Sequence, residues 1–275
     1  MWDLKAIKNR DPLAVDAERE WEEEQEALGE IDRSHYVYKF RSFDAGGFTL
    51  KALAESCLWC SHFKSFNDLF EFRFEFDRHP AKTDEMFEQW RRDFPQYREM
   101  SRKMVPIYGI EIMKGLLDDF GISCFTKDPL NPLMWSYYAD SYRGMCLAFE
   151  FPQLDDGHLS GDSIHEVRYA SEPLIFDLLL LKDRPQILTN LVPFVTTKHE
   201  IWKHEAEWRY VGFKEARKPV PYRKDALKEI VFGPNTSSET KAAVKAVCEE
   251  NGLTPRFMSV QLNSWSYTLH LSYGA

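Results

Sequence analysis

Apolar and polar positions alternate with the period of β-strands over much of this chain. Alternation over residues 35–42 predicts the first core strand, and the exchange of phenylalanine with charged residues predicts a strand over 70–76. In that second strand Phe70, Phe72, Phe74 and Phe76 are expected on one face, because successive side chains of a strand point to opposite faces. Further strands are expected at 58–60, 121–126, 144–149, 167–169, 208–213, 229–232, 256–260 and 265–271.

Helical spacing of apolar residues occurs between these strands. An acid-rich stretch at 13–31 predicts a surface helix that precedes the folded core. Thr49 is placed to cap a helix over 50–57. The remaining helical patterns cover 82–118 with breaks near Pro95 and Pro106, 133–140, a long zone over 173–203, and 237–250.

The organisation of the chain is predicted from these elements together. No stretch rich in Gly, Ser or Pro divides it, and no segment repeats at a fixed period. We therefore expect one α+β domain over residues 35–275, with small antiparallel sheets flanked by helices. A helical extension over residues 1–34 is expected to precede it.

Composition narrows the classes of function. The chain has 44 acidic and 35 basic residues, and its net charge of −9 argues against loose association with nucleic acid or anionic membranes. Its longest apolar run, at 173–181, is too short to predict a membrane span. The odd number of cysteines, five, and the lack of a signal segment predict a cytoplasmic protein with reduced thiols. Cys57 and Cys60 form a C-x-x-C, but no second pair completes a zinc site, so no metal is expected.

Two acids one residue apart, Glu205 and Glu207, lead into the strand expected at 208–213. If the chain is extended there, alternation places both on one face with Arg209. Carboxylates this close raise each other's proton affinity, so they are solvated, neutralised, or used for acid/base work, a metal or a developing cation. The alternative is that Arg209 neutralises them at a strand end.

Several short strings, in order over about residues 35–235, resemble a bacterial family catalogued as domain of unknown function 2971. The strings are 38–42, 66–68 with Phe70 and Glu71, 121–126, 134–140, 144–149, and Glu205 with Glu207 and Arg209. The name of that family supplies no activity.

The order of elements is also similar to the ADP-ribosyltransferase fold. Enzymes of its Arg, Ser, Glu class place an arginine on the first core strand, a Ser-x-Ser or Ser-Thr-Ser string on a middle strand, and Glu-x-Glu just before a later strand. Phe125 stands where that pattern has its second hydroxyl, so this chain departs from the pattern on the middle strand. The counterparts here are Arg41, Ser123 with Thr126, and Glu205 with Glu207.

This second resemblance implies an NAD-dependent ADP-ribosyltransferase or NAD glycohydrolase. Cleavage of the bond between nicotinamide and ribose passes through an oxocarbenium-like transition state, which the carboxylate of Glu207 would stabilise. Glu205 would orient or deprotonate the acceptor, which is a macromolecule or water. Arg41 would bind a phosphate or ribose oxygen of NAD, and Ser123 would hold the ribose and the glutamate by hydrogen bonds. By analogy alone, such a protein would be a bacterial toxin or a phage-defence effector.

Aromatic side chains are needed to enclose the nicotinamide ring, and the available residues are Tyr38, Phe66, Trp135, Tyr137 and Tyr138. Asn67 follows a short strand, where a pocket wall is expected. The alternative for the aromatic residues is a place in the core, and for Asn67 a turn that it shapes with its own side chain.

Two other functions stay open at this point. The first is a metal-dependent nuclease that binds Mg²⁺ through Asp68, Glu71, Glu205 and Glu207. The second is a non-catalytic interaction module, in which the acidic helix at 13–31 docks a basic protein partner.

Overall fold

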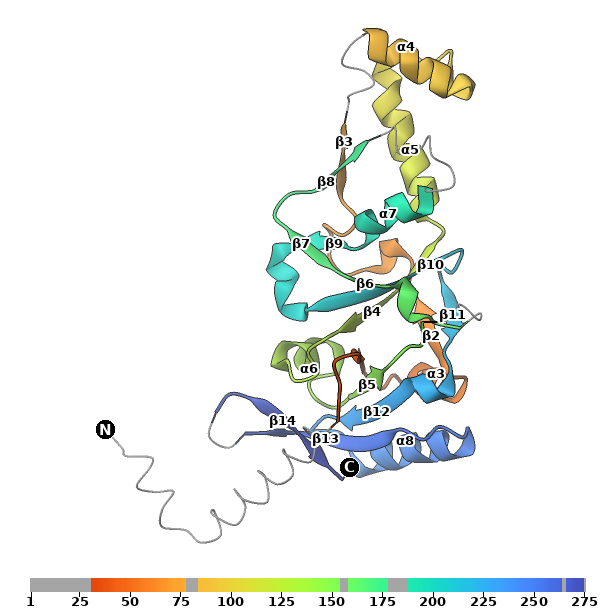
Figure 1. The fold of residues 1–275 in the computed structure, drawn as a ribbon. Coiled ribbons are helices and arrows are strands. Elements are labelled where there is room, and N and C mark those ends of the chain that lie inside the picture. Colours follow the sequence, from red (N-terminus) through yellow and green to blue (C-terminus); the bar gives the residue numbers. More distant parts are fainter. Residues whose placement is uncertain (1–30, 78–83, 154–157, 178–186, 264–265, 275) are drawn as a thin grey trace, which may run out of the picture. The chain divides into compact units, whose positions relative to one another are not determined.

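The computed structural model describes residues 31–77, 84–153, 158–177, 187–263 and 266–274 (Figure 1). The helix expected at 13–31 therefore lies outside the described residues, apart from residue 31. The chain divides into two compact units, of which the first comprises Met1–Glu55, Asp128–Phe151 and Lys224–Ala275. The second comprises Ser56–Lys127 and Pro152–Arg223. The expectation of one domain over residues 35–275 stays a prediction.

The first unit is built on a mixed sheet with the strand order β14-β13-β12-β5-β1. Neighbouring strands are antiparallel except β12 and β13, which are parallel and are joined through a helix, α8. The strands are β1 (Val37–Arg41), β5 (Met145–Phe149), β12 (Leu227–Phe232), β13 (Arg256–Leu262) and β14 (Leu269–Tyr273).

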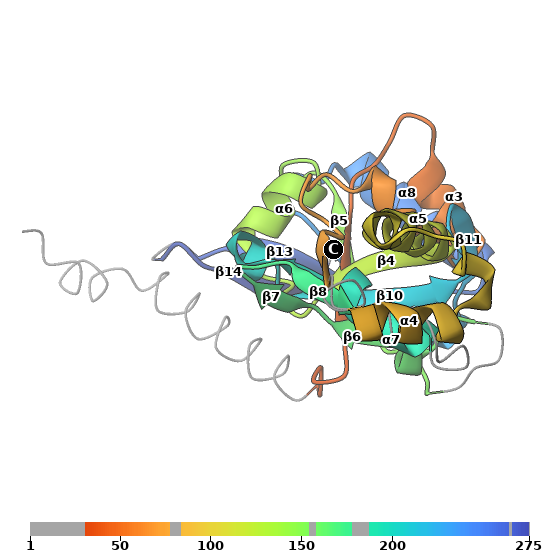
Figure 2. The ribbon, with the colours of Figure 1, turned by 90° about the horizontal axis from the view of Figure 1, so that it is seen from above.

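Helices α3 (Phe48–Ala54), α6 (Pro132–Tyr138) and α8 (Ser238–Glu250) belong to the same unit. The side chain of Ser237 accepts a hydrogen bond from Thr240 N–H and so caps α8. Helix α3 packs beside α8 (Figure 2). A short 3-10 helix, η9 (Lys224–Ala226), precedes β12.

The start of α3 differs from the prediction that Thr49 caps it. Gly47 precedes the helix with φ 69°, and the carboxylate of Asp44 accepts hydrogen bonds from Phe48 N–H at 2.9 Å and Thr49 N–H at 3.0 Å. The turn through Gly47 places Asp44 within reach of these free N–H groups, so Asp44 is the capping residue.

The second unit contains a sheet of strand order β4-β10-β6, in which all neighbours are antiparallel. Its strands are β4 (Phe120–Thr126), β10 (Glu207–Phe213) and β6 (Ile164–Glu166). Three strand pairs accompany it: antiparallel β2 (Cys57–Cys60) with β11 (Lys218–Pro221), parallel β3 (Phe74–Asp77) with β8 (Leu174–Asp177), and parallel β7 (Arg168–Ala170) with β9 (Thr197–His199).

The helices of the second unit are α4 (Asp84–Asp93), α5 (Val105–Leu117) and α7 (Ile187–Val195). The break expected near Pro95 is confirmed, since a 3-10 helix begins there, whereas Pro106 lies in the first turn of α5 and does not interrupt it. Five 3-10 helices are described here: η1 (Phe63–Ser65), η3 (Pro95–Tyr97), η4 (Arg102–Met104), η5 (Gly161–Ser163) and η8 (Glu200–Glu205).

Each unit has its own apolar core. The first core surrounds Trp135 and Cys146, and the second surrounds Phe72, Phe176 and Val211. The mixture of helices and strands is confirmed, but the sheets are not purely antiparallel as expected, because three strand pairs are parallel. Among the described helices, none has the length and apolar character needed to cross a membrane.

Two predicted elements of the second unit are wrong. The strand expected over 70–76 is limited to β3, because Phe72 has φ 59°, which an extended strand does not adopt. Phe70 is 59% exposed and Phe72 is 7% exposed, so the phenylalanines do not share a face. The helical zone expected over 173–203 contains β8, α7, β9 and η8 among its described residues.

Candidate functional site

Five charged side chains of the second unit meet beside the beginning of β10, and none is more than 4% exposed. Burial on this scale is unusual for ionisable groups unless they are paired. We call this group the buried ion cluster; its members are Glu71, Lys198, Glu205, Glu207 and Arg209.

Local geometry explains how neighbouring residues reach the cluster. Glu207 begins β10 and Arg209 follows two positions later, so both side chains lie on one face of the strand. Glu205 lies before this strand, as the last residue of η8, so the extended conformation considered for residues 205–209 does not include it. Ala206, with φ 42° and ψ 49°, turns the chain into β10. The hydroxyl of Tyr169, on β7, accepts a hydrogen bond of 2.8 Å from Glu207 N–H and so fixes the start of the strand.

Lys198, in the middle of β9, is the cation shared by all three acids. Its Nζ donates to Glu205 Oε2 at 2.5 Å and to Glu207 Oε2 at 2.9 Å. The same nitrogen lies 3.5 Å from Glu71 Oε1. Removing Lys198 would therefore affect every carboxyl group in the cluster.

Arg209 binds two of the acids with its fixed set of donors. Nε donates to Glu207 Oε1 at 2.8 Å and Nη2 donates to Glu207 Oε2 at 3.0 Å, which is a bidentate pair. Nη2 also donates to Glu71 Oε1 at 2.7 Å, and Nη1 donates to Val195 O at 2.8 Å. The guanidinium faces the rings of Phe66 and Phe72 at 5.4 and 5.5 Å. These contacts compensate the complete burial of the Arg209 charge.

The environment shifts the pKa values of the acids in opposite directions. Burial raises the pKa of Glu207, but the charge and hydrogen bonds of Arg209 and the charge of Lys198 outweigh it and leave a pKa of about 2. For Glu71 burial dominates, and its pKa is raised above the ordinary value. Burial lowers the pKa of Lys198, but the charges and hydrogen bonds of Glu207 and Glu205 raise it by more than burial lowers it, so the net shift is upward. Glu207 is consequently ionised at neutral pH.

Ser123 lies on the other face of the sheet from Glu207. The antiparallel register pairs Ser123 with Tyr210, whereas Glu207 pairs with Thr126 and Arg209 pairs with Cys124. Directly opposed residues share a face, so the predicted placement of Ser123 beside the glutamate is wrong. Its Oγ is buried without a hydrogen-bond partner among the described residues.

The hydroxyl on the face of Glu207 belongs to Thr126. Its Oγ1 donates a hydrogen bond of 2.7 Å to Glu205 O and so joins β4 to the end of η8. Thr126 N–H lies in the β4 ladder, and the next residue, Lys127, donates from its N–H to Ala206 O at 3.1 Å. Residues around this corner therefore hold the Glu-x-Glu turn in place.

Three of the aromatic candidates, Tyr38, Trp135 and Tyr138, belong to the core of the first unit. Phe66 packs against the core of the second unit, and Tyr137 is 62% exposed. Tyr38 is 3% exposed and Trp135 is fully buried, while Tyr138 is half-buried against the same core. The indole Nε1 of Trp135 donates to Pro129 O at 2.8 Å, and its ring packs edge-on against Phe40 at 5.0 Å. These are the contacts of core residues, and the predicted role in enclosing nicotinamide remains untested.

Arg41 and Asn67 lie in different units. Arg41 is the last residue of β1 in the first unit and is half-buried. Asn67 is exposed in the loop after η1, in the second unit. In that loop the carboxylate of Asp68 accepts a hydrogen bond of 2.9 Å from Phe70 N–H, so Asp68 shapes the turn. The ligand roles of Arg41 and Asn67 stay predictions.

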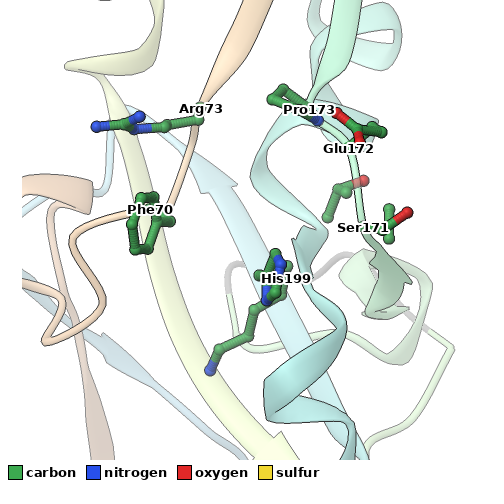
Figure 3. A pocket seen from close by; sticks show the side chains of 9 residues that line it. Phe70, Arg73, Ser171, Glu172, Pro173 and His199 are labelled. Atoms are coloured by element: carbon green, nitrogen blue, oxygen red, sulfur yellow. The ribbon is translucent and has the colours of Figure 1, made fainter.

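A cavity of about 280 Å³ lies in the second unit beside the cluster. Figure 3 shows Phe70 and Arg73 on one wall and Ser171, Glu172, Pro173 and His199 on the other. The remaining lining residues are Ala170, Thr197 and Lys198. Lys198 thus belongs both to the cavity wall and to the buried ion cluster.

Three of the four acids of the nuclease alternative are bound to protein cations in this arrangement, and the fourth, Asp68, accepts a backbone hydrogen bond. Glu71 and Glu207 contact both Lys198 and Arg209, and Glu205 contacts Lys198. Within the described ranges, no group of three or more His, Cys, Asp or Glu side chains is arranged to hold a metal ion.

Two members of the cluster were not predicted as part of an NAD site. Lys198 gave no signal, because a single lysine near a strand is usually a solvated residue. The sequence predicts Glu71 as a metal ligand of the nuclease alternative and as part of one DUF2971 string, but not as a residue of an NAD site. Its contact with Arg209 joins residues 138 positions apart, which no local pattern reports.

Comparison with known families gives one match. Residues 134–210 match a family described as protein of unknown function, DUF2971, which confirms the first resemblance over this part of the chain. The matched residues include Lys198, Glu205, Glu207 and Arg209. No curated protein and no solved structure matches the chain.

Proposed function

We propose that this chain, whose residues 134–210 match the DUF2971 family, cleaves the bond between nicotinamide and ribose in NAD. It would act as an ADP-ribosyltransferase or as an NAD glycohydrolase, on a fold similar to the ADP-ribosyltransferases. One observation supports this most directly: Glu207, ionised and held in place by Arg209, contacts a lysine that also lines a cavity.

The chemistry needs a fixed carboxylate near the ribose. When the C–N bond breaks, its electron pair leaves with nicotinamide, and positive charge develops on the ribose ring. A buried carboxylate that is already ionised and oriented stabilises this charge without reorganising at the moment of reaction. Glu207 has these properties, since both of its oxygens are hydrogen-bonded and its pKa is about 2.

Glu205 is placed for a role with the acceptor. After nicotinamide leaves, the oxygen of water or of an acceptor group bonds to the ribose carbon and loses a proton. The Glu205 side chain reaches the cluster from the end of η8, where its Oε2 accepts a hydrogen bond from Lys198 Nζ. In the proposed reaction Glu205 orients that acceptor.

The cavity offers groups suited to a part of NAD. Its volume is near the lower end of the range for small-molecule pockets, which is about 300–1,000 Å³, so it would hold one portion of the dinucleotide. The ring of Phe70 provides a surface for stacking, and Arg73 lies 4.8 Å from its centroid as a partner for phosphate. Glu172 offers oxygens to ribose hydroxyls.

Nicotinamide release from NAD by the purified protein tests this proposal. Wild type is compared with two variants: Glu207→Gln removes the charge, and Glu207→Asp keeps the charge but withdraws the carboxylate. Each protein is assayed with and without cell lysate as a source of acceptor. Glu166→Gln, an exposed change on the neighbouring strand β6, is the matched control. We expect release by wild type and Glu166→Gln and a loss of about 10²- to 10³-fold in Glu207→Asp.

The outcomes separate the alternatives. A requirement for lysate would indicate transfer to a macromolecule, and release without it would indicate hydrolysis. If wild type and Glu166→Gln release no nicotinamide in either condition, NAD cleavage is rejected. Glu205 and Glu207 then serve as structural partners of Lys198 and Arg209.

A further inference from the structure

The buried ion cluster contains one more carboxyl group than it contains cations. Glu71, Glu205 and Glu207 face Lys198 and Arg209, while the Cys124 thiol on β4 lies opposite Arg209. An uncompensated charge in a site excluded from water is costly, and such a site usually takes up a proton instead. Of the two carboxyl groups that Arg209 binds, the geometry shows which one has room for that proton.

Both oxygens of Glu207 are occupied. Oε1 accepts from Arg209 Nε, and Oε2 accepts from Arg209 Nη2 and from Lys198 Nζ. A proton on either oxygen would displace a charged donor. Glu207 is therefore a poor place for the additional proton.

Glu71 differs from Glu207 in that one of its two carboxyl oxygens has no hydrogen-bond partner among the described residues. Its Oε1 accepts from Arg209 Nη2 at 2.7 Å, but its Oε2 is buried without a hydrogen-bond partner among the described residues. A buried carboxylate oxygen that accepts nothing carries charge without compensation, whereas protonation of that oxygen removes the charge and with it the larger part of the desolvation cost. The Glu71 side chain is 2% exposed, so bulk water does not solvate it.

We propose that Glu71 holds a proton on Oε2 in the resting site and that loss of this proton converts the cluster from neutral to anionic. The anionic cluster stabilises a cation on the ribose better than the neutral cluster does. Glu71 is thus a proton-dependent control on the site, acting through Arg209 and Lys198. This inference rests on the proposed function for its effect on rate, but the proton itself does not.

The upward shift of the Glu71 pKa supports this assignment. Burial raises it, the charges and hydrogen bonds of Arg209 and the charge of Lys198 oppose that effect, and Glu207 adds to it. Glu207 shares the same Arg209 and is shifted in the other direction. A pair of carboxyl groups whose pKa values are pushed apart is the arrangement that separates an ionised group from a proton carrier.

The proton is tested first without any substrate. Infrared spectra of the full chain with isotope-labelled glutamate, recorded at neutral pH, should show a protonated carboxylic acid band that is absent from Glu71→Gln. Glutamine imitates the protonated acid, so Glu71→Gln should keep Tm within about 2 °C of wild type. Glu207→Gln, which removes the bidentate carboxylate partner of the buried Arg209, should lower Tm by roughly 6–20 °C.

The effect on rate is tested by the pH profile of nicotinamide release. In wild type we expect the rate to rise with pH as Glu71 loses its proton, and in Glu71→Gln we expect a rate about tenfold or more below that plateau, without this rise. Glu166→Gln should keep the wild-type profile.

Each result has a separate meaning. If the acid band is missing and Glu71→Gln destabilises the protein as much as Glu207→Gln does, Glu71 is ionised and the inference is wrong. If the band is present but wild type releases no nicotinamide at any pH, the proton is established, the proposed function fails, and the control of rate fails with it. If the band is present and Glu71→Gln retains the wild-type pH profile, the proton does not control the site.

Discussion

Replacing Lys198 with methionine tests the buried ion cluster most directly. Methionine keeps the length and apolar stem of lysine but removes the Nζ that contacts Glu205 at 2.5 Å and Glu207 at 2.9 Å. Three carboxyl groups would then share Arg209 as their remaining cation in the cluster. The variant therefore creates uncompensated negative charge in a site that is at most 4% exposed.

The expected cost is large compared with the stability of a domain. Removing one partner of a buried ion pair typically destabilises a protein by about 3–5 kcal/mol. The free energy of unfolding of a domain is about 5–15 kcal/mol, so Lys198→Met should remove about a fifth of it or more. At about 2–4 °C per kcal/mol, Tm should fall by roughly 6–20 °C.

A matched control is available in the same unit. Lys64 pairs with Asp118 at 3.2 Å, and the two side chains are 61% and 48% exposed. Because water and salt screen such a pair, Lys64→Met should cost about 0–1 kcal/mol. Denaturant unfolding at pH 7 and thermal scans of both variants give the comparison.

The pH dependence has a defined sign. The acids raise the pKa of Lys198 above its ordinary value, so its stabilising effect is fully present at pH 7 and is lost only as pH rises through that higher pKa. In Lys198→Met, acid protonates the carboxylates and relieves their repulsion. The Tm difference from wild type should therefore narrow as pH falls from about 8 to about 5. A loss no greater than that of Lys64→Met, or a difference that does not narrow, would refute the reasoning.

Three further predictions concern the sheet face, the cavity and the cell. Ser123→Ala should keep Tm within about 2 °C of wild type and nicotinamide release within about twofold, because Ser123 faces away from Glu207 and its hydroxyl has no described partner; a tenfold loss of release would contradict the face assignment. Phe70→Ala and Arg73→Ala should raise KM for NAD by about tenfold with little change in Tm, since both side chains are exposed in the cavity wall; an unchanged KM would place NAD elsewhere. Expression of wild type should arrest bacterial growth and Glu207→Asp should relieve the arrest, as measured by growth curves at matched protein levels; normal growth with soluble, active wild type would reject the toxin role.

Most regular elements could be predicted from local pattern. The strands at 121–126, 144–149 and 208–213 are confirmed as β4, β5 and β10 within one residue of the predicted bounds. The helix expected at 237–250 is α8, with Ser237 at its cap. These signals succeed because period and capping depend on residues only a few positions apart.

Other elements could not be predicted from period alone. The phenylalanine pattern at 70–76 resembled a strand, but the positive φ of Phe72 interrupts it. The apolar stretch at 174–176 fitted a helix, but these residues form β8 because β3 pairs beside them. The periodicity of a short apolar run does not distinguish a strand from a helix, so the segment that pairs with the run determines which of them forms.

The sequence by itself determined that two glutamates and an arginine precede and begin a core strand, and that such acids need a cation or a use. Tertiary structure alone decided which cations meet them. Lys198 lies on β9, which is positioned by its pairing with β7, and Glu71 lies 138 positions before Arg209 in the chain. The face of Ser123 likewise followed from the register of β4 against β10, not from its neighbours in the chain. Charge compensation depends on distances of a few ångströms between distant segments, and only the packed fold sets those distances.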